Sequence, residues 1–335
     1  MSPGARASVR RWTTLPAQLA VRARLFILHG THEHCGKPCY AELAAACNAV
    51  GIEAFSLDFH GHGRNADGAR GDFGSLDDAI ADAVEMIVAE SGRDGDDVPV
   101  ILFGHSLGSM VCFLLAHQLA TTPSLPTPAC VVLSGFAMDS VSPPFGVQSL
   151  TPVLRALPSV VRAVCALLAT LAPTGPACPL PPPEALMNDP ERARLTAADP
   201  LQYQGWIQNR TAIALLDGRA RCNALLAEWG AGGFPFLLIH GGQDALCPRS
   251  ACDALLAAAP QRDKTLRVYD ASRHEVLNDV PARRQRATQD VVAWLDERVP
   301  KPRPGAAGPP QVVGHHEAHL PHGQEHPPTT LRSKL

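Results

Sequence analysis

A serine between two glycines, a later aspartate and a later histidine could together carry out nucleophilic catalysis in this chain. The serine is Ser106, in the sequence Gly104-His105-Ser106-Leu107-Gly108, which follows an apolar run and precedes an apolar helical pattern. A serine on a sharp strand-to-helix turn exposes its hydroxyl, and glycines two residues before and after it let the strand and helix approach closely. Because a hydroxyl is a weak nucleophile until a base removes its proton, the motif requires a histidine and an acid elsewhere.

Asp244 and His274 are the candidates for the acid and the base. Asp244 follows the apolar run 234–239, and His274 follows the run that ends at Tyr269. Each lies just beyond the carboxyl end of a predicted strand, where open α/β sheets place their sites, and the order serine, acid, histidine is that of α/β-hydrolases. Asp270, four residues before His274, is a competing acid that we expect to cap a turn.

Hydrolysis of an ester also needs two backbone donors for the oxyanion. The N–H of Leu107, directly after the candidate nucleophile, is one of them. The N–H of Thr31, in the loop His29-Gly30-Thr31 after the first buried run, is the other. We therefore predict acyl transfer through an acyl-enzyme on Ser106. The alternative from a different class is a non-catalytic lipid-binding protein that keeps the fold.

Short apolar runs bounded by turn residues predict the strands that position these groups. Continuously apolar runs of this length are typical of a parallel sheet covered by helices on both faces. The runs are residues 25–28, 52–57, 98–103, 129–133, 234–239 and 266–269. Ser75 caps a predicted helix, and residues 106–119 and 282–299 predict two more. The alternation predicts an α/β-hydrolase fold, a mostly parallel doubly wound sheet with an inserted helical cap.

Proline marks where this alternation stops. The 335 residues include 31 prolines, which gather between residues 139 and 233 and after residue 300. The first stretch offers no clear strand, so we predict a mostly helical cap over 139–233, inserted into a core formed by 22–138 and 234–299. Residues 1–21 are interpreted as a short basic leader. Residues 300–335 are expected to form a disordered tail with solvated histidines, because Pro, Gly and His bury too little surface to fold.

Composition excludes several other classes of protein. The net charge of −3 provides no basic field for a polynucleotide, so we expect no nucleic-acid partner. The ten cysteines lack the spacing of zinc ligands or of a disulfide framework, which predicts reduced thiols and no metal or cofactor. The most apolar stretch, 153–172, is interrupted by Arg155, Pro158 and Arg162 and is not a convincing transmembrane span.

Two features bear on where the protein acts. The predicted cap has an apolar pattern that could cover an acyl channel or lie peripherally in a membrane interface. Its residues are Leu154, Leu157, Val160, Val161, Val164, Leu167, Leu168 and Leu171. The chain ends in Ser333-Lys334-Leu335, the address read by the peroxisomal import receptor. We expect a peroxisome or a glycosome-type organelle, with cytoplasm or a peripheral membrane location as the alternative.

Several motifs occur together in one order along residues 22–299. They are His29-Gly30-Thr31-His32-Glu33-His34, Gly61-His62-Gly63, the Ser106 motif, Asp199-Pro200-Leu201, Asp244-Ala245-Leu246-Cys247 and the seven residues 263–269. In this the chain resembles the monoglyceride lipase and lysophospholipase branch of the serine α/β-hydrolases. The resemblance implies that a monoacylglycerol (or a lysophospholipid) is cleaved to a free fatty acid and glycerol under a cap that opens toward lipid.

The resemblance also implies roles for three side chains that could bind substrate. Glu33 corresponds to a residue near the glycerol-binding end of the pocket, the alternative being a structural hydrogen bond beneath the oxyanion loop. Cys247 corresponds to a pocket-lining cysteine, either sensitive to thiol reagents or buried and inert. Lys37 replaces the family's arginine after the Glu-His pair, and Leu277 stands where animal members have a second histidine. Both departures concern the glycerol end of the pocket and not ester hydrolysis.

A peroxisomal acyl-CoA thioesterase is the second enzymatic hypothesis. Such an enzyme needs cationic side chains for the phosphates of CoA at the mouth of the pocket, and Arg192, Arg194 and Arg210 in the predicted cap are the candidates. Dehalogenases and epoxide hydrolases of this fold class use a carboxylate nucleophile, and Ser106 argues against them.

Overall fold

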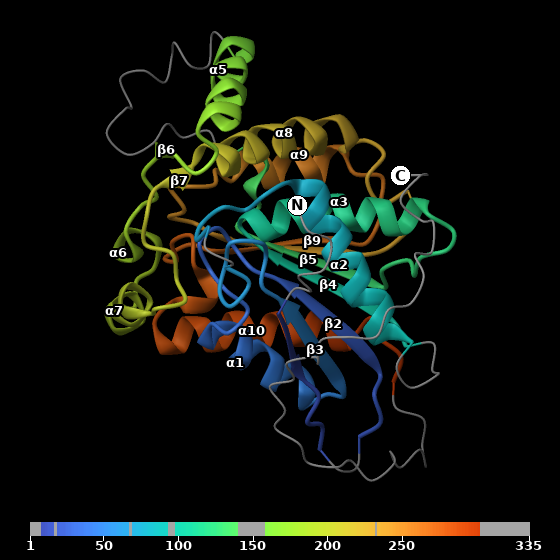
Figure 1. Ribbon diagram of the computed structural model, residues 1–335. Helices are drawn as coiled ribbons and strands as arrows, with labels where there is room; N and C mark the ends of the chain where they lie inside the picture. Colours follow the sequence, from blue (N-terminus) through green and yellow to red (C-terminus); the bar gives the residue numbers. More distant parts are fainter. Residues whose placement is uncertain are drawn as a thin grey trace, which may run out of the picture.

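The computed structural model describes residues 8–16, 19–66, 69–92, 98–139, 158–231 and 233–301. Leu154, Leu157 and the terminal Ser333-Lys334-Leu335 lie outside the described residues. A seven-stranded sheet forms the centre of the molecule, in the order β1-β3-β2-β4-β5-β8-β9 (Figure 1). β1 is antiparallel to β3, and every other neighbouring pair in this sheet is parallel. This is the predicted mostly parallel sheet of an α/β-hydrolase.

The predicted apolar runs are confirmed as strands, with small shifts at their ends. They are β2 (Ala23–Leu28), β3 (Ile52–Leu57), β4 (Val100–His105), β5 (Cys130–Ser134), β8 (Phe236–Gly241) and β9 (Lys264–Tyr269). Every residue of β2, β3, β4, β5 and β8 is buried, because helices cover both faces of the sheet. β9 lies at the edge and is only partly buried.

One strand lies in the segment that the sequence interpretation assigned to a basic leader. β1 (Val9–Trp12) pairs with β3, with Val9 opposite Leu57 and Trp12 opposite Ala54. Its two central arginines are exposed, and Arg11 forms an ion pair with Glu90 of α2 at 2.6 Å. A short, charged edge strand has no continuous apolar run, which is why the sequence pattern did not indicate it.

Helices form a layer on each face of the sheet (Figure 1). α2 (Leu76–Ser91), α3 (Leu107–Thr121) and α9 (Ser250–Ala258) pack on one face. α1 (Pro38–Asn48) and α10 (Pro281–Asp296) pack on the other. The predicted N-cap residue of α2 is confirmed, since the Ser75 hydroxyl accepts a hydrogen bond from the backbone N–H of Asp78 at 3.1 Å. Neither α1 nor α9 was predicted.

The cap lies between β5 and β8 and is mostly helical in its described part. It contains α5 (Pro158–Leu171), α6 (Pro183–Leu186), α7 (Pro190–Ala198) and α8 (Asn209–Leu225). The expectation that it has no strand is wrong, because β6 (Pro176–Cys178) and β7 (Ile207–Gln208) form a small antiparallel pair. α5 packs on α8 at the outer end of the cap (Figure 1). No described helix is both long and apolar enough to cross a bilayer. All ten cysteines are described, and none forms a disulfide.

Candidate active site

Ser106 occupies a strained turn between β4 and α3, with φ 52° and ψ −122°. The flanking glycines make this turn possible. A Cβ at Gly104 would lie 2.3 Å from the carbonyl oxygen of Gly108, and one at Gly108 would lie 2.1 Å from that of Leu28. Since real Cβ atoms do not approach backbone so closely, both positions require glycine for the strand and helix to pack. The turn presents Ser106 at the carboxyl end of a central strand.

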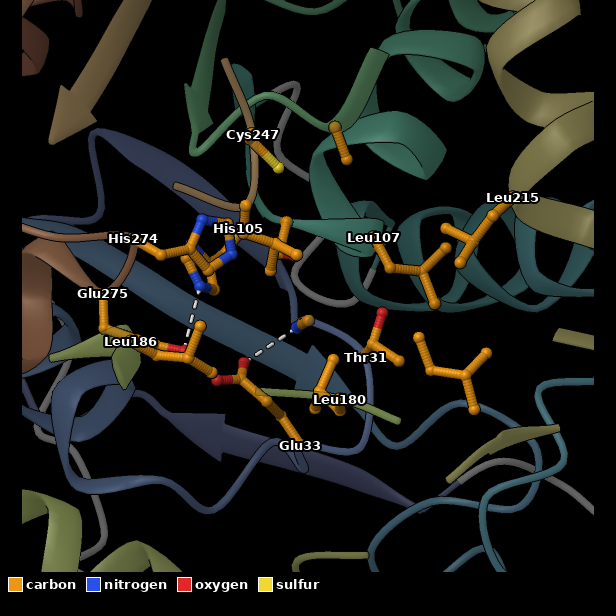
Figure 2. A pocket seen from close by; sticks show the side chains of 15 residues that line it. Thr31, Glu33, His105, Leu107, Leu180, Leu186, Leu215, Cys247, His274 and Glu275 are labelled. Carbon is orange, nitrogen blue, oxygen red and sulfur yellow. Dashed lines mark hydrogen bonds and ion pairs between the residues drawn. The ribbon is translucent and has the colours of Figure 1, made fainter. Parts of the chain in front are cut away.

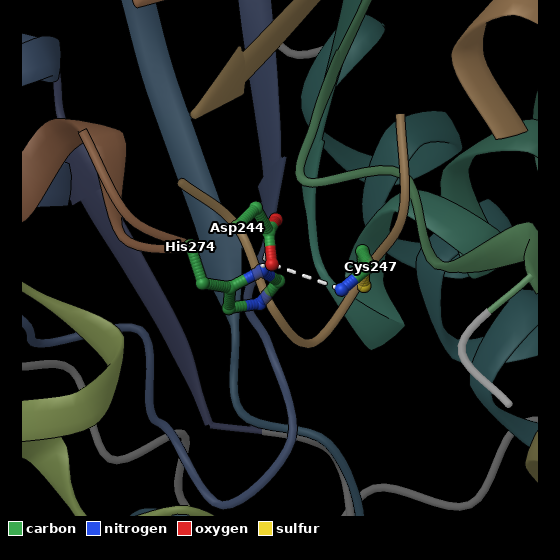
Figure 3. Close-up of side chains that lie close together, drawn as sticks. All are labelled: Asp244, Cys247 and His274. Carbon is green, nitrogen blue, oxygen red and sulfur yellow. Dashed lines mark hydrogen bonds and ion pairs between the residues drawn. The ribbon is translucent and has the colours of Figure 1, made fainter. Parts of the chain in front are cut away.

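The carboxylate beside His274 is that of Asp244 and not that of Asp270. Nδ1 of His274 donates a hydrogen bond to Oδ2 of Asp244 at 2.8 Å. The other oxygen, Oδ1, accepts the backbone N–H groups of Leu246 and Cys247, both at 2.9 Å (Figure 3). The pair can form because β8 and β9 are parallel neighbours, so the loops after their carboxyl ends meet.

The charges of this pair influence one another strongly. Burial alone would lower the pKa of His274, but the Asp244 carboxylate outweighs it and holds that pKa well above its ordinary value. Burial raises the pKa of Asp244, and His274 with the two backbone N–H donors lowers it further than burial raises it. Asp244 is therefore ionised, and His274 binds a proton readily, as a general base does.

The ring of His274 fits against a second glycine turn. Gly135 follows β5 with φ +54°, and a Cβ there would lie 2.8 Å from Cε1 of the His274 ring. Nε2 of His274 is buried and has no hydrogen-bond partner within the described chain. This nitrogen is therefore available to a group in the pocket that His274 and Ser106 both line.

That pocket, the catalytic pocket, has a volume of about 70 Å³ (Figure 2). Thr31 and Leu107, the predicted oxyanion donors, both line it. Leu107 begins α3, and the first N–H groups of a helix have no partner within it. The rest of the wall is mainly apolar: Leu180, Leu186, Ile207 and Leu215 come from the cap, and Leu246 comes from the loop after β8.

Cys247, predicted to contact substrate, also lines the catalytic pocket. It is buried, and Figure 3 shows it directly beside Asp244 and His274. Its backbone N–H orients the carboxylate of Asp244. Cys247 therefore both lines the catalytic pocket with its side chain and helps to hold the Asp244 carboxylate in place with its backbone N–H.

A buried charged cluster lies beneath the oxyanion loop. Glu33 Oε2 accepts the N–H of Gly30 at 2.8 Å (Figure 2) and the hydroxyl of Tyr40 at 2.5 Å. Lys37 forms an ion pair with Glu33 Oε1 and lies 3.8 Å from Glu275. The position of Glu33 agrees with both interpretations offered above, a contact to substrate and a structural hydrogen bond. Its carboxylate accepts the N–H of Gly30 in the loop that carries Thr31, and the residue also lines the catalytic pocket.

Glu275 was not predicted from the sequence, although it directly follows His274. Its Oε1 lies 3.3 Å from Nε2 of His105, the residue before Ser106 (Figure 2). Its Oε2 accepts the side-chain amide of Asn278 at 2.8 Å. Burial raises the pKa of Glu275, but Lys37 and His105 outweigh it and hold that pKa well below its usual range. Only the fold brings these residues together, so spacing could not have indicated them.

Two sets of side chains have the donor types that metals use. They are Asp244, Cys247 and His274, and Glu33, His105 and Glu275. The carboxylates of both sets are engaged by protein donors: Asp244 by His274 and backbone N–H groups, Glu33 by Lys37, Tyr40 and Gly30, and Glu275 by Asn278. The side chains of both sets are therefore held together by hydrogen bonds and ion pairs within the protein, and we assign neither set to a metal.

A second, more polar cavity of about 220 Å³ adjoins the catalytic pocket. We call it the polar chamber. It shares Thr31, Glu33, Leu180, Leu186 and Glu275 with the catalytic pocket. Its own lining includes Lys37, His32, Gln202 and Tyr203. The site therefore has a mainly apolar part around Ser106 and a polar part beyond the oxyanion loop.

A serine on a strand-to-helix elbow, with a paired histidine and aspartate on the neighbouring loops, defines a serine hydrolase of the α/β-hydrolase fold. Comparison with known families gives a narrower placement. The model of the serine aminopeptidase S33 family matches residues 20–281, and the chain belongs to this family.

Individual relatives agree with this placement. The chain is 30% identical to a monoacylglycerol lipase of Mycolicibacterium smegmatis over 281 residues, covering 82% of this chain and 88% of the relative. It is 25% identical to the monoglyceride lipase of Mus musculus, covering 86% of each chain. Among solved structures, a soluble variant of monoglyceride lipase from Saccharomyces cerevisiae superposes with a TM-score of 0.68 at 18% identity, covering 88% of this chain and 92% of that one.

Proposed function

We propose that this protein is a serine ester hydrolase that cleaves monoacylglycerols, or lysophospholipids, to a free fatty acid and the alcohol. The observation that carries the proposal is the Asp244–His274 pair beside Ser106, in a pocket that is mainly apolar around the serine and opens to a polar chamber. The names of the relatives at 30% and 25% identity support the same substrate class.

In the proposed reaction His274 Nε2 takes the proton of the Ser106 hydroxyl as its oxygen attacks the ester carbonyl carbon. The N–H groups of Thr31 and Leu107 stabilise the oxyanion of the tetrahedral intermediate. The bond to the alcohol then breaks, and His274 gives its proton to the leaving oxygen. Water attacks the acyl-enzyme, with His274 as base; the bond between the acyl carbon and the Ser106 oxygen then breaks, His274 returns the proton to that oxygen, and the fatty acid is released. Asp244 keeps the imidazole in the required tautomer and stabilises its charge.

The two parts of the site determine how the ester lies. The acyl chain contacts the apolar wall, which includes Leu180, Leu186 and Leu215 from the cap. The alcohol enters the polar chamber, which Glu33 and Lys37 line, whereas Cys247 lines only the catalytic pocket. Because the Lys37 ammonium is already paired with Glu33 and lies near Glu275, the described lining of the chamber offers no free cation. This favours an uncharged alcohol such as glycerol over a phosphate-bearing one.

The acyl-CoA thioesterase hypothesis is not favoured by the positions of its candidate arginines. Arg192 pairs with Glu42, Arg194 with Glu191, and Arg210 with Asp72 at 2.9 Å. None of the three arginines lines the catalytic pocket or the polar chamber. An engaged guanidinium away from the pocket is poorly placed to bind the phosphates of CoA.

A panel of substrates with one shared acyl chain tests the proposed function. We expect hydrolysis of monoacylglycerol to be fastest, followed by a lysophospholipid and then an acyl-CoA, with released fatty acid as the measurement. Faster cleavage of the acyl-CoA would favour the thioesterase instead. A folded protein that cleaves none of them would support the non-catalytic lipid-binding alternative.

We also propose that α5 contacts a lipid surface. Leu167 and Leu171 are 57% and 72% exposed, and Val160 and Val164 are each at least half exposed on the same helix. Large apolar side chains that gather on one exposed face of a helix, with polar residues around them, are typical of contact with a membrane interface. The exposed pair Arg162–Asp217, at 2.7 Å, joins α5 to α8 and leaves these apolar side chains outward.

Substituting serine for Leu167 and Leu171 together should weaken binding to phosphatidylcholine vesicles about tenfold or more, because each buried leucine contributes roughly 1.5–3 kcal/mol. Co-sedimentation with the vesicles measures this. Leu195→Ser, at an exposed leucine of α7, is the matched control and should bind like the wild type. Equal binding by the double variant and the control would contradict the role of α5.

We propose import into a peroxisome-type organelle through the terminal Ser333-Lys334-Leu335. Deleting these three residues should move the protein to the cytosol, as followed by fluorescence microscopy of the full chain carrying an N-terminal tag. Replacing Leu331, two residues before Ser333, with alanine is the control and should leave the location unchanged. An unchanged location after the deletion would reject this import route.

A further inference from the structure

The polar chamber is lined by a histidine whose backbone and side chain are both unusual. His32 has φ 64°, and Ser106 is the only other described non-glycine residue with positive φ. Strain of this kind persists where surrounding contacts hold it, and it gathers at functional sites. Here the cap holds it: the carbonyl of His32 accepts the N–H of Tyr203 at 3.0 Å, and the two rings meet edge-on with centroids 4.7 Å apart.

The side chain of His32 lacks the partners that a buried polar group normally has. It is 1% exposed, and neither ring nitrogen has a hydrogen-bond partner in the described part of the chain. Gln202 lines the same chamber, and its Oε1 is likewise buried and unpartnered among the described residues. Because most buried polar atoms are hydrogen-bonded, these three atoms indicate a polar ligand in the chamber.

The chemistry of His32 narrows the kind of ligand. Burial, together with the nearby His62, lowers the pKa of His32 to about 3, so its ring is neutral. A neutral imidazole has one donor nitrogen and one acceptor nitrogen, and Gln202 Oε1 is an acceptor. Hydroxyl groups both donate and accept, so a diol complements this set. An anion is less well matched, because the ammonium of Lys37 is already paired with Glu33 and the imidazole of His32 is neutral.

We propose that His32 and Gln202 bind the free hydroxyls of the alcohol part of the ester and so make the enzyme selective for esters of polyols. The inference rests on the proposed ester hydrolysis at Ser106. His32 lies between Thr31, which supplies the proposed oxyanion donor, and Glu33, which holds the loop through Gly30. A bound polyol therefore contacts the loop that stabilises the oxyanion.

Two variants and two substrates with one acyl chain test the inference. His32→Gly removes the imidazole while glycine keeps the positive φ without strain, and Gln202→Leu removes the acceptor at similar volume. Each variant should lower kcat/KM for the monoacylglycerol about tenfold and change kcat/KM for the corresponding methyl ester less than about twofold. The methyl ester has no hydroxyls to lose, so the ratio of the two values reports the contact.

Gln208→Leu is the matched control. Gln208 is buried and its Oε1 also lacks a partner among the described residues, but it lines neither the catalytic pocket nor the polar chamber. It should leave the ratio unchanged. Parallel losses on both esters in His32→Gly, or unchanged values on both in the two variants, would overturn the inference. A wild type that cleaves neither ester would reject the proposed function itself.

Discussion

Replacing Ser106 with alanine is expected to lower kcat for a monoacylglycerol about 10⁶-fold, because no hydroxyl remains to form the acyl-enzyme. Hydrolysis assays measure the loss, and labelling with a fluorophosphonate reports the nucleophile directly. The wild type should be labelled and the variant should not. The fold should survive, since the Cβ of serine is retained at this turn and the flanking Gly104 and Gly108 still let β4 and α3 pack.

Ser91→Ala is the control for this experiment, since Ser91 ends α2 and lines neither the catalytic pocket nor the polar chamber. It should be labelled and active like the wild type. Labelling that persists in Ser106→Ala would place the nucleophile elsewhere. A folded wild type that is not labelled would contradict serine catalysis altogether.

Replacing Asp244 with asparagine should lower kcat about 10⁴-fold, the next largest effect. The amide cannot hold His274 in the tautomer whose Nε2 accepts the serine proton, and it no longer stabilises the imidazolium. The matched control is Asp270→Asn, at the acid that competes with Asp244 in the sequence. We expect it to retain nearly full activity. A large loss in Asp270→Asn with a small one in Asp244→Asn would reverse the assignment.

The pH dependence of the same two enzymes gives a separate measurement. In the wild type Asp244 raises the pKa of His274 well above its ordinary value. Since the base must be unprotonated, kcat/KM should rise with pH as His274 loses its proton at that raised pKa. In Asp244→Asn the raising charge is absent, so the rise should move to lower pH and end at a much lower plateau. A wild-type profile that falls with rising pH over this range would contradict the role of His274 as base.

Much of the sheet could be predicted because its strands are continuously apolar. Burial on both faces forces each residue of β2, β3 and β4 to be compatible with the interior, and that requirement is visible in a short stretch of sequence. β1 is exposed at one edge and β6 and β7 are very short, so no such requirement marks them. Their pairing depends on partners far away in the chain.

The sequence by itself determined the elbow, because the spacing of Gly104, Ser106 and Gly108 reflects local contacts between one strand and the helix that follows it. It also determined the order of the candidate nucleophile, acid and base along the chain. The tertiary structure decided which acid pairs with His274. The parallel alignment of β8 and β9 brings Oδ2 of Asp244 to 2.8 Å from Nδ1 of His274, although the two residues are 30 positions apart in the chain. The chamber around His32 likewise required the fold, because its walls come from the oxyanion loop, the cap and the segment after His274. Local motifs are set by contacts between neighbours in the chain, whereas a pocket is set by packing between distant segments.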